Sequence, residues 1–420
     1  MSALLPAALD PALPQLGDCL DATGTARALE RSWPAPVPGG NPVHVLECSR
    51  HHVRYEPGVR CAVAWSVRVQ LDGLAPATTI AVTEVDAGGR RQRLFGDDPA
   101  LPGLATASDA AAMAPRLREA TGVDRWTARV VRYRAGERAV VRYEGQTDGE
   151  DPVERRLLYA KVLARGAAAL DATLRAWHEA ARHRPFLPAV GAPVALYEEL
   201  GAVVGEATPG QPIRDVLYGP EAGDRARGDV LRRAGRALAA LAGADLGPVP
   251  TTAMADLLEP VRSIVPLVRA DSPALAARLE EAVEALDGDG DEPTVASHGS
   301  YRADHVLLDG ARTYVLDVDG VCRAAPERDA GNLLAYLRWK AVREPARADV
   351  ADQAAPALEA GYAFGRPALD RNRLRRYEAT ALLRIAAGRY RNLAVEQWPL
   401  VPALLDAATS LVQDRVRAVP

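Results

Sequence analysis

The chain has 420 residues, long enough for two or three compact parts; 48% are hydrophobic, 25% are charged, and the formal net charge is −4. This balance argues against a nucleic-acid-binding protein that relies on a broad basic surface. The four cysteines lack the spacing of metal ligands, and no segment approaches about 20 uninterrupted apolar residues. Because the N-terminus also lacks the basic start of a signal peptide, we expect a cytoplasmic protein with reduced thiols and no membrane span.

The first part of the chain is expected to be rich in β-strands. Residues 43–165 alternate apolar with polar side chains, are rich in Val, Arg and Tyr, and contain Gly and Pro turns. Within them, His52–Val63 resembles Val130–Val141, because both contain Arg-Tyr, then Gly, then Arg, then an apolar pair. We interpret the two segments as hairpins built alike, with Gly58 and Gly136 in their turns.

Lys161 lies in an apolar run, Leu157–Leu163, that is predicted to be a strand. Only two of the 51 Lys and Arg residues are lysines, and burying a lysine in an apolar strand is costly unless it faces an anion. The offset of the hairpin repeat places Thr83 of the first copy at the position of Lys161 in the second. A lone strand lysine also commonly protects the edge of a sheet, so both interpretations stay open.

From Gly166 onward helical periodicity dominates. The stretches that are rich in Ala and Leu with helical spacing are 167–183, 224–243, 254–270, 273–286, 327–343, 347–362 and 370–391. Between the first two of them, 194–210 is predicted to form two strands around a turn, followed by a linker. A β-rich first part followed by a mostly helical second part indicates the α+β class.

The segment 295–319 carries the most informative pattern. The loop Ser297–Ser300 is followed by a short apolar strand, an Asp-Gly turn, and a second apolar strand that ends in Asp317 and Asp319. Such a hairpin holds a loop and two carboxylates near one another, with the carboxylates on the same face of the strand. An ordinary buried hairpin with polar ends is the alternative.

This pattern resembles the catalytic and metal-binding segments of the aminoglycoside phosphotransferase and choline kinase family. There, His-Gly-Asp is followed after four residues by Asn, then by a strand, a turn and a strand that ends in Asp, and the spacing here fits without gaps. The resemblance implies a two-lobed protein-kinase-like fold that uses ATP and Mg²⁺ to phosphorylate a hydroxyl group. It also implies that His298 braces the loop and that Asp317 binds the metal, with Asp319 as a second carboxylate.

Two positions depart from the family pattern. Ser300 replaces the catalytic aspartate, which accepts the proton of the substrate hydroxyl, and His305 replaces the metal-binding asparagine. A neutral imidazole is a poorer ligand than an amide oxygen for a hard cation such as Mg²⁺. Asp304 becomes a substitute base only if the register of the motif shifts. The candidate catalytic residues are His298, Ser300, Asp304 and His305.

The resemblance assigns the phosphates of the nucleotide to Lys161. In the kinase fold this strand lysine contacts the phosphates and pairs with a glutamate of the next helix. That helix, predicted at 167–183, offers Asp171 and Glu179, and Glu179 fits the family position better. We therefore predict that Lys161 and Glu179 serve the nucleotide, and that Lys161 faces Asp317 across a cleft.

Two further segments resemble parts of the nucleotide lobe. The turn Tyr133–Arg138 takes the place of the glycine-rich loop, so that its backbone amides, with Arg134 or Arg138, lie over the phosphates. The alternative is that these arginines are ordinary solvated turn residues. The segment 194–210 resembles the hinge, where backbone groups hold the adenine.

The predicted organisation has an N-terminal accessory module (1–123), a small β-rich nucleotide lobe (124–208) and a large helical lobe (209–420). The first hypothesis is an ATP- and magnesium-dependent phosphotransferase that acts on a hydroxyl of a small molecule, or of a peptide in a biosynthetic pathway. The second is a pseudokinase that binds or regulates a protein partner, and the third is a kinase fold repurposed for non-phosphoryl chemistry. Neither a nucleic acid nor a membrane is expected as a partner.

Overall fold

The computed structural model describes residues 10–33, 42–71, 74–146, 155–220, 223–288 and 294–417. The chain divides into two compact units, which are described separately below. Unit 1 comprises Met1–Asp171, Val194–Glu206 and Arg391–Leu393, and unit 2 comprises Ala172–Pro193, Ala207–Tyr390 and Ala394–Pro420. Among the described residues, no helix is both long enough and apolar enough to cross a membrane.

One of the two predicted domain boundaries lies close to a boundary between the units, and the other does not. The predicted boundary at 208 lies next to Glu206, where a segment of unit 1 ends, whereas the predicted boundary at 123 lies inside unit 1. The separation of an accessory module from a nucleotide lobe therefore stays a prediction. The mixture of sheets and helices confirms the α+β class.

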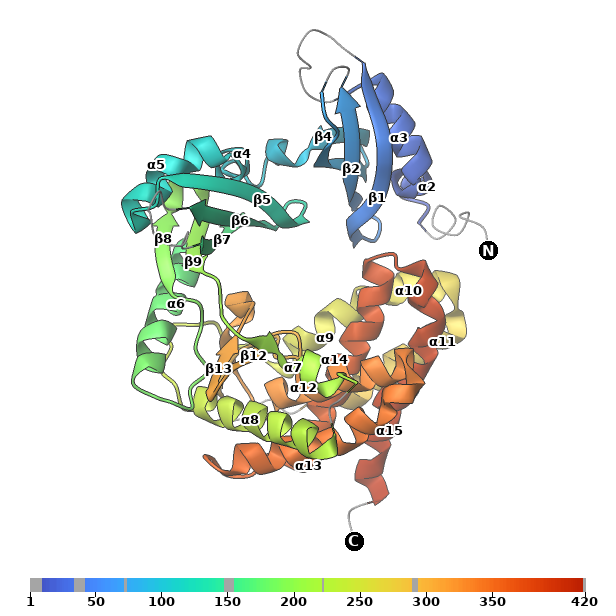
Figure 1. Ribbon diagram of the computed structural model, residues 1–420. Helices are drawn as coiled ribbons and strands as arrows, with labels where there is room; N and C mark the ends of the chain where they lie inside the picture. The colour runs from blue at the N-terminus through green and yellow to red at the C-terminus, as the bar shows by residue number, and fades with distance from the viewer. Residues whose placement is uncertain are drawn as a thin grey trace. The chain divides into compact units, whose positions relative to one another are not determined.

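Unit 1 is built around two antiparallel sheets (Figure 1). The first sheet has the order β1 (Val43–Glu56), β2 (Arg60–Leu71), β3 (Ala77–Asp86) and β4 (Gly89–Leu94). The second has the order β5 (Arg125–Arg134), β6 (Arg138–Gln146), β7 (Arg155–Leu163), β9 (Ala202–Glu206) and β8 (Pro193–Tyr197). Helices α2 (Leu16–Leu20) and α3 (Ala22–Arg31) pack on the first sheet, and α4 (Leu104–Ser108) and α5 (Ala110–Thr121) pack on the second.

Helices α4 and α5 correct the prediction that 43–165 consists of strands and hairpins. Their sequence is rich in alanine, which favours helices, and Asp109 caps α5 by accepting hydrogen bonds from the amides of Ala111 and Ala112. Leu104, Met113 and Leu117 of the two helices are fully buried in one core with the second sheet. The helices therefore cover one face of the sheet that carries Lys161.

The two sheets share the turn that the hairpin repeat predicts. Tyr55 pairs with Cys61 across the first turn, and Tyr133 pairs with Ala139 across the second, so the two turns have the same length. The similarity also reaches further towards the N-terminus than the hairpins. The sequence Asp-Pro-Ala-Leu-Pro occurs at 10–14, before α2, and again at 98–102, before α4. Each copy is thus a polar loop, two helices and a meander of strands.

The repeat shifts by one residue in its third strand. Glu84 of β3 lies opposite Ala62, and Lys161 of β7 lies opposite Val140, which is the counterpart of Ala62. Lys161 therefore corresponds to Glu84, and the prediction that it corresponds to Thr83 is wrong. Because successive residues of a strand point to opposite faces, this shift of one residue changes the face on which the counterpart of the lysine lies.

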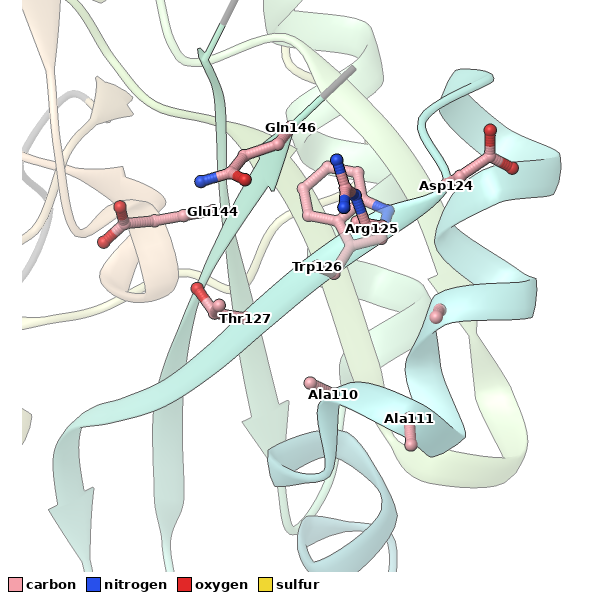
Figure 2. A pocket seen from close by; sticks show the side chains of 9 residues that line it. Ala110, Ala111, Asp124, Arg125, Trp126, Thr127, Glu144 and Gln146 are labelled. Carbon is pink, nitrogen blue, oxygen red and sulfur yellow. The ribbon is translucent and has the colours of Figure 1, made fainter. Parts of the chain in front are cut away.

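A pocket of about 500 Å³ opens in unit 1 between α5 and the start of the β5–β6 pair (Figure 2). Trp126 forms one wall, and its indole N–H donates to the carbonyl of Val123 at 2.9 Å. A Cβ on Gly145 would come within 2.7 Å of the same ring, so glycine is needed there. The polar group of Trp126 is satisfied within the protein. The pocket is lined on one side by alanines of α5 and on the other by polar side chains of the strands, among them Arg125, Glu144 and Gln146.

Unit 2 is mainly helical. Its long helices are α8 (Asp224–Ala242), α9 (Met254–Arg262), α10 (Val265–Asp271), α11 (Pro273–Leu286), α12 (Glu327–Arg343), α13 (Ala348–Ala363), α14 (Arg371–Arg391) and α15 (Val401–Arg417). The predicted helix 254–270 is divided into α9 and α10, because Pro266 lacks the amide hydrogen that a continuous helix needs. Helix α6 (Ala167–Arg182) begins in unit 1 and ends in unit 2.

Two small sheets of unit 2 carry the segment 295–319. One consists of β10 (Gln211–Pro212), β12 (Val306–Asp309) and β13 (Arg312–Val315), and the other of β11 (Val295–Ser297) and β14 (Cys322–Ala324). Asp309 pairs with Arg312 across a tight turn, as the Asp-Gly sequence predicts. The loop between β11 and β12 is therefore held at both ends by strands.

Candidate functional site

The loop after β11 is fixed by the side chain of Asp329, in the first turn of α12. Its carboxylate accepts hydrogen bonds from Ser297 Oγ at 2.9 Å, from the His298 amide at 2.6 Å and from the Gly299 amide at 2.9 Å. Asp329 is buried, so these bonds lie where an unpaired charge would be costly. Sequence reasoning had taken this residue only as part of a helix start.

Gly299 is required by the path of this loop. Its φ is +80°, and a Cβ added to it would lie 1.9 Å from the carbonyl oxygen of Gly320. The carbonyl of Gly299 accepts a hydrogen bond from Arg328 Nη2 at 3.3 Å. The guanidinium of Arg328 also contacts the thiol of Cys322, so the loop, β14 and α12 are joined.

His298 is fully buried beneath the loop. Its Nε2 lies 2.8 Å from the carbonyl oxygen of Leu316, which can only accept, so Nε2 carries the hydrogen. Its Nδ1 then accepts from the amide of Ser300 at 3.3 Å. With both nitrogens engaged, the side chain is placed to hold the loop, and these contacts support the predicted bracing role.

The hydroxyl of Ser300 contacts two histidine rings and one backbone carbonyl. The Oγ atom lies 3.5 Å from Nδ1 of His298, 3.5 Å from Nδ1 of His305 and 3.4 Å from the carbonyl oxygen of Asp317. These are long contacts for a hydroxyl group. Because a serine hydroxyl does not accept a proton near neutral pH, Ser300 can position a substrate group but cannot replace a carboxylate base.

His305 has both ring nitrogens engaged by the same loop. Its Nε2 lies 3.0 Å from Nε and 2.8 Å from Nη2 of Arg302, and its Nδ1 lies 2.9 Å from the carbonyl oxygen of Ser300. Because arginine only donates, Nε2 is an acceptor and Nδ1 carries the hydrogen. Burial, with the charge of Arg302, lowers the pKa of His305 to about 3. The predicted catalytic role of His305 is therefore not supported, because the lone pair of Nε2 is already used.

Asp317 and Asp319 do not lie on one face of a strand, which corrects the sequence prediction. Strand β13 ends at Val315, and Val318–Gly320 forms a single helical turn. Asp317 itself adopts the left-handed conformation, with φ 60° and ψ 52°. This conformation is uncommon for residues other than glycine and is often found at functional sites. Oδ2 of Asp317 lies 3.8 Å from Nε2 of His305.

Asp304 is engaged away from Ser300. Its Oδ1 accepts a hydrogen bond from Nη1 of Arg214 at 2.7 Å. Burial, and then a hydrogen bond to Asp304, raise the pKa of the Tyr336 phenol. These two partners leave Asp304 poorly suited to the role of substitute base that the sequence had left open.

Of the two predicted metal-binding positions in unit 2, Asp317 fits a magnesium ion and His305 does not. Within the described ranges, no three His, Cys, Asp or Glu side chains converge as a complete metal site. Mg²⁺ that is bound with a nucleotide usually needs only one or two carboxylates, because phosphates and water complete its shell. The partly exposed carboxylate of Asp317 fits this role. His305 does not, because its Nε2 accepts from Arg302.

Lys161 lies in the middle of the second sheet of unit 1. Strand β7 is flanked by β6 and β9, and Lys161 lies opposite Val140 and Val203. The alternative interpretation, a lysine that protects a sheet edge, is therefore wrong. A partly buried lysine in a central strand is instead consistent with contact to an anionic group. Its approach to Asp317, which belongs to the other unit, stays a prediction.

Glu179 lies near the end of α6 and is engaged by basic side chains of its own helix end. Its side chain is 59% exposed and lies 3.2 Å from Nη1 of Arg182 and 2.9 Å from Nε2 of His183. The hydrogen bond to His183, together with the charge of Arg182, lowers the pKa of Glu179. Asp171, in contrast, is buried near the start of α6 and belongs to unit 1 with Lys161. Glu179 and Lys161 belong to different units, so the pairing of Lys161 with Glu179 stays a prediction.

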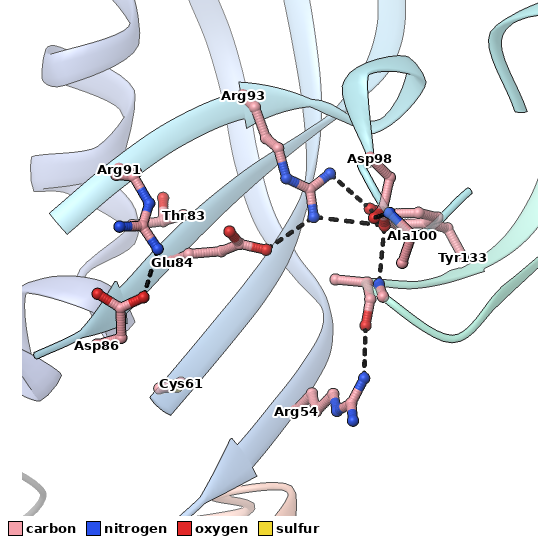
Figure 3. Close-up of polar contacts among 12 residues, drawn as sticks. Arg54, Cys61, Thr83, Glu84, Asp86, Arg91, Arg93, Asp98, Ala100 and Tyr133 are labelled. Atoms are coloured by element: carbon pink, nitrogen blue, oxygen red, sulfur yellow. Dashed lines mark hydrogen bonds and ion pairs between the residues drawn. The ribbon is translucent and has the colours of Figure 1, made fainter. Parts of the chain in front are cut away.

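Two amides of the turn between β5 and β6 are already engaged within unit 1. The amide of Gly136 donates to Oδ2 of Asp98 at 2.8 Å, and the same oxygen accepts from the Tyr133 hydroxyl at 2.6 Å (Figure 3). The amide of Glu137 donates to the carbonyl of Arg134 at 3.0 Å. A buried carboxylate thus occupies the turn, and the predicted phosphate contact through its amides is not supported.

A family model, that of the phosphotransferase enzyme family, matches residues 126–371, which is more than half of the chain. The chain belongs to this family. The matched region begins in β5 and includes both Lys161 and the segment 295–319, so the resemblance drawn from the sequence is confirmed. No curated protein shows a significant match to the chain.

Solved structures of several phosphotransferases resemble the chain. Spectinomycin phosphotransferase, in complex with ADP and spectinomycin, has 13% identity and a TM-score of 0.47, over 73% of this chain and 99% of that one. A choline/ethanolamine kinase family protein from Mesorhizobium loti has 16% identity and a TM-score of 0.47, over 74% and 99%. A glucosamine kinase has 17% identity and a TM-score of 0.41, over 93% and 99%.

Proposed function

We propose that the protein is an ATP-dependent phosphotransferase that acts slowly on a hydroxyl group of a small molecule or a peptide. The observation that carries the proposal lies in the loop of unit 2, inside the region that matches the family. Asp329 holds the loop in place and Asp317 is retained, but Ser300 stands where a carboxylate base is expected. The site thus keeps groups for binding and lacks the group for proton removal.

Slow transfer is consistent with the chemistry of phosphoryl groups. The transition state of phosphoryl transfer is loose and depends more on positioning and charge neutralisation than on proton abstraction. Loss of a positioned base typically reduces a rate by roughly 10²–10⁴-fold. Ser300 would orient the acceptor hydroxyl, which would lose its proton to water late in the reaction. Turnover would therefore be low but measurable.

The binding roles fall on residues that the family pattern retains. Lys161 would contact the nucleotide phosphates, with Glu179 as its acidic partner. Asp317 would hold Mg²⁺, which neutralises charge on the phosphates when it is bound with the nucleotide. Asp319 would act through water or not at all, because it lies on the turn that follows and not on the strand.

ATP binding and turnover should be measured separately. We expect calorimetry to detect ATP binding that is weakened about tenfold or more by Lys161→Ala, since this variant removes a charge-assisted contact. Lys340→Ala is the matched control, because Lys340 is the only other lysine and lies in α12 over the ring of Tyr336. Absence of ATP binding by the unaltered protein would exclude the proposal.

A pseudokinase remains a second candidate because of the contacts around Ser300. His305 has both nitrogens engaged, Asp304 is paired with Arg214, and His298, which also contacts the Ser300 hydroxyl, uses its Nε2 hydrogen on the carbonyl of Leu316. For a pseudokinase we expect ATP binding without phosphate release above the blank and without transfer to any offered alcohol. The same contacts weaken the third hypothesis, in which Ser300 and His305 perform new chemistry.

A further inference from the structure

Arg302 is a cation without an acidic partner at the loop of unit 2. Its guanidinium is partly buried, and its Nε and Nη2 groups donate to one nitrogen of neutral His305. In the part of the chain that the structure describes, Arg302 forms no ion pair with a carboxylate. A guanidinium carries five N–H groups, so several donors remain for a ligand. A partly buried positive charge of this kind favours an anion.

His305 acts as the support that orients Arg302. The imidazole is only 6% exposed, and its Nδ1 donates to the carbonyl of Ser300, which fixes the plane of the ring. Its Nε2 faces the guanidinium. His305 stands at the sequence position where the family has a metal-binding asparagine. Its acceptor atom, Nε2, holds the guanidinium of Arg302 and is therefore not available to a metal ion.

The guanidinium shares its surroundings with Asp317. Nε2 of His305, to which Arg302 donates, lies 3.8 Å from Oδ2 of Asp317. A fixed positive charge on the other side of His305 attracts a phosphate and can supply part of the charge neutralisation that a second metal ion would provide. The planar fork of arginine also matches two oxygens of one phosphate group, a geometry that a lysine does not provide.

We propose that Arg302, oriented by His305, binds a phosphate group of the nucleotide and replaces one metal ion. The inference rests on the proposed function, since it assumes that this loop serves a nucleotide. It adds that the affinity for ATP depends strongly on Arg302 and only weakly on free Mg²⁺. Arg302 is thus a binding residue that the family pattern does not contain.

The test is a calorimetric titration of the full chain with ATP, in EDTA and again in excess Mg²⁺. We expect the unaltered protein to bind ATP in both buffers with less than about a threefold difference in Kd. Arg302→Ala should weaken binding in EDTA about tenfold or more, and Arg302→Lys should recover only part of the loss because it lacks the fork. The control is Arg323→Ala, an exposed arginine of β14 that donates to the carbonyl of Thr294, and it should bind as the unaltered protein does.

A second variant tests the role of His305. His305→Asn supplies an amide oxygen that suits Mg²⁺, so binding should become weaker in EDTA and recover in Mg²⁺. If the unaltered protein binds ATP only in Mg²⁺, and Arg302→Ala binds ATP as tightly as the unaltered protein does, this inference is overturned and the phosphotransferase proposal stays intact. No binding in either buffer would overturn both. Thermal unfolding of each variant shows whether it is folded. If Arg302→Ala does not fold, the affinity of Arg302→Lys for ATP in EDTA tests the proposal instead.

Discussion

At the scale of single residues, the loop of unit 2 depends on one carboxylate. Asp329 accepts from one hydroxyl and two amides of Ser297–Gly299, and the buried Arg328 beside it holds the carbonyl of Gly299. Neither residue belongs to the chemistry expected of a kinase loop, yet both determine where Ser300 lies. The shape of the loop therefore does not depend on the side chain at position 300.

Replacement of Asp329 should therefore destabilise the protein more than an ordinary surface change. Asp329→Ala leaves two buried donors and one partly buried donor without an acceptor, and we expect a loss on the order of 2–4 kcal/mol in the free energy of unfolding. Asp329→Asn keeps one acceptor oxygen and should lose less. Urea denaturation measures both, with Asp352→Ala on the exposed face of α13 as the control. Equal stability of Asp329→Ala and the control would contradict the role given to Asp329.

Part of the site could be predicted from the sequence, and the rest depends on contacts between distant residues. The spacing of His298, Ser300 and Asp317 located the loop and the retained acid. The partners of His305 could not be derived from spacing, since Arg302 reaches it only because the loop folds back on itself. The assignment of Glu179 follows the family position and stays a prediction, because Glu179 and Lys161 belong to different units.

At the scale of elements, close packing between helices requires glycine at particular positions. Helices α8 and α13 approach so closely that a Cβ on Gly235 would lie 2.2 Å from the carbonyl oxygen of Leu358. From the other side, a Cβ on Gly361 would lie 2.1 Å from the carbonyl oxygen of Arg232. The helices were predictable from periodicity, but this crossing was not, because an isolated glycine in a helical stretch does not reveal its neighbours.

Two alanine substitutions should therefore have opposite effects on stability. Gly361→Ala must separate α8 from α13, and we expect a loss of about 1–3 kcal/mol although alanine favours helices. Gly388→Ala, in α14, meets no atom within 4 Å and should gain up to about 1 kcal/mol. Thermal and urea unfolding of both variants test the argument. A gain in both would show that the crossing can relax.

The pairing register of the third strand in each sheet, β3 and β7, could be predicted from the sequence only in part. The hairpins of the two sheets align through Tyr55 and Tyr133, but the third strands differ by one residue, so Glu84 and not Thr83 corresponds to Lys161. The repeated Asp-Pro-Ala-Leu-Pro sequence was a clearer signal than the hairpins. This repeat places α2 and α4 at the same position in the two copies, whereas the strand pattern predicted for 43–165 contained no helix.

At the scale of the whole molecule, the family match begins at residue 126, so the first sheet lies outside it. That sheet nevertheless belongs to the same compact unit as the second. Contacts from its strands reach the turn of the second sheet: Arg54 donates to the carbonyl of Ala135 at 3.3 Å, and Arg93 donates to the hydroxyl of Tyr133 at 2.9 Å (Figure 3). The first sheet therefore supports the turn between β5 and β6.

Arg93 is the residue through which this support can be tested. Its side chain is 15% exposed and lies 2.7 Å from Glu84 and 3.3 Å from Asp98, the carboxylate that holds Gly136. Among the described residues, Arg93 is the only cation that forms an ion pair with buried Asp98. Arg93→Ala leaves this carboxylate without a cationic partner, and we expect a loss on the order of 2–4 kcal/mol in the free energy of unfolding.

The control for Arg93 lies on the same strand. Arg91 is 57% exposed and pairs with Asp86 of the neighbouring strand, so Arg91→Ala should change stability by less than about 1 kcal/mol. Urea unfolding followed by tryptophan fluorescence compares the two variants in two single-tryptophan backgrounds. One background keeps only Trp65, in the first sheet, and the other keeps only Trp126, in the second sheet. If the first sheet supports the second, Arg93→Ala lowers the unfolding midpoint of both signals. A shift confined to one sheet, or equal effects of the two variants, would mean that the sheets are stable independently of each other.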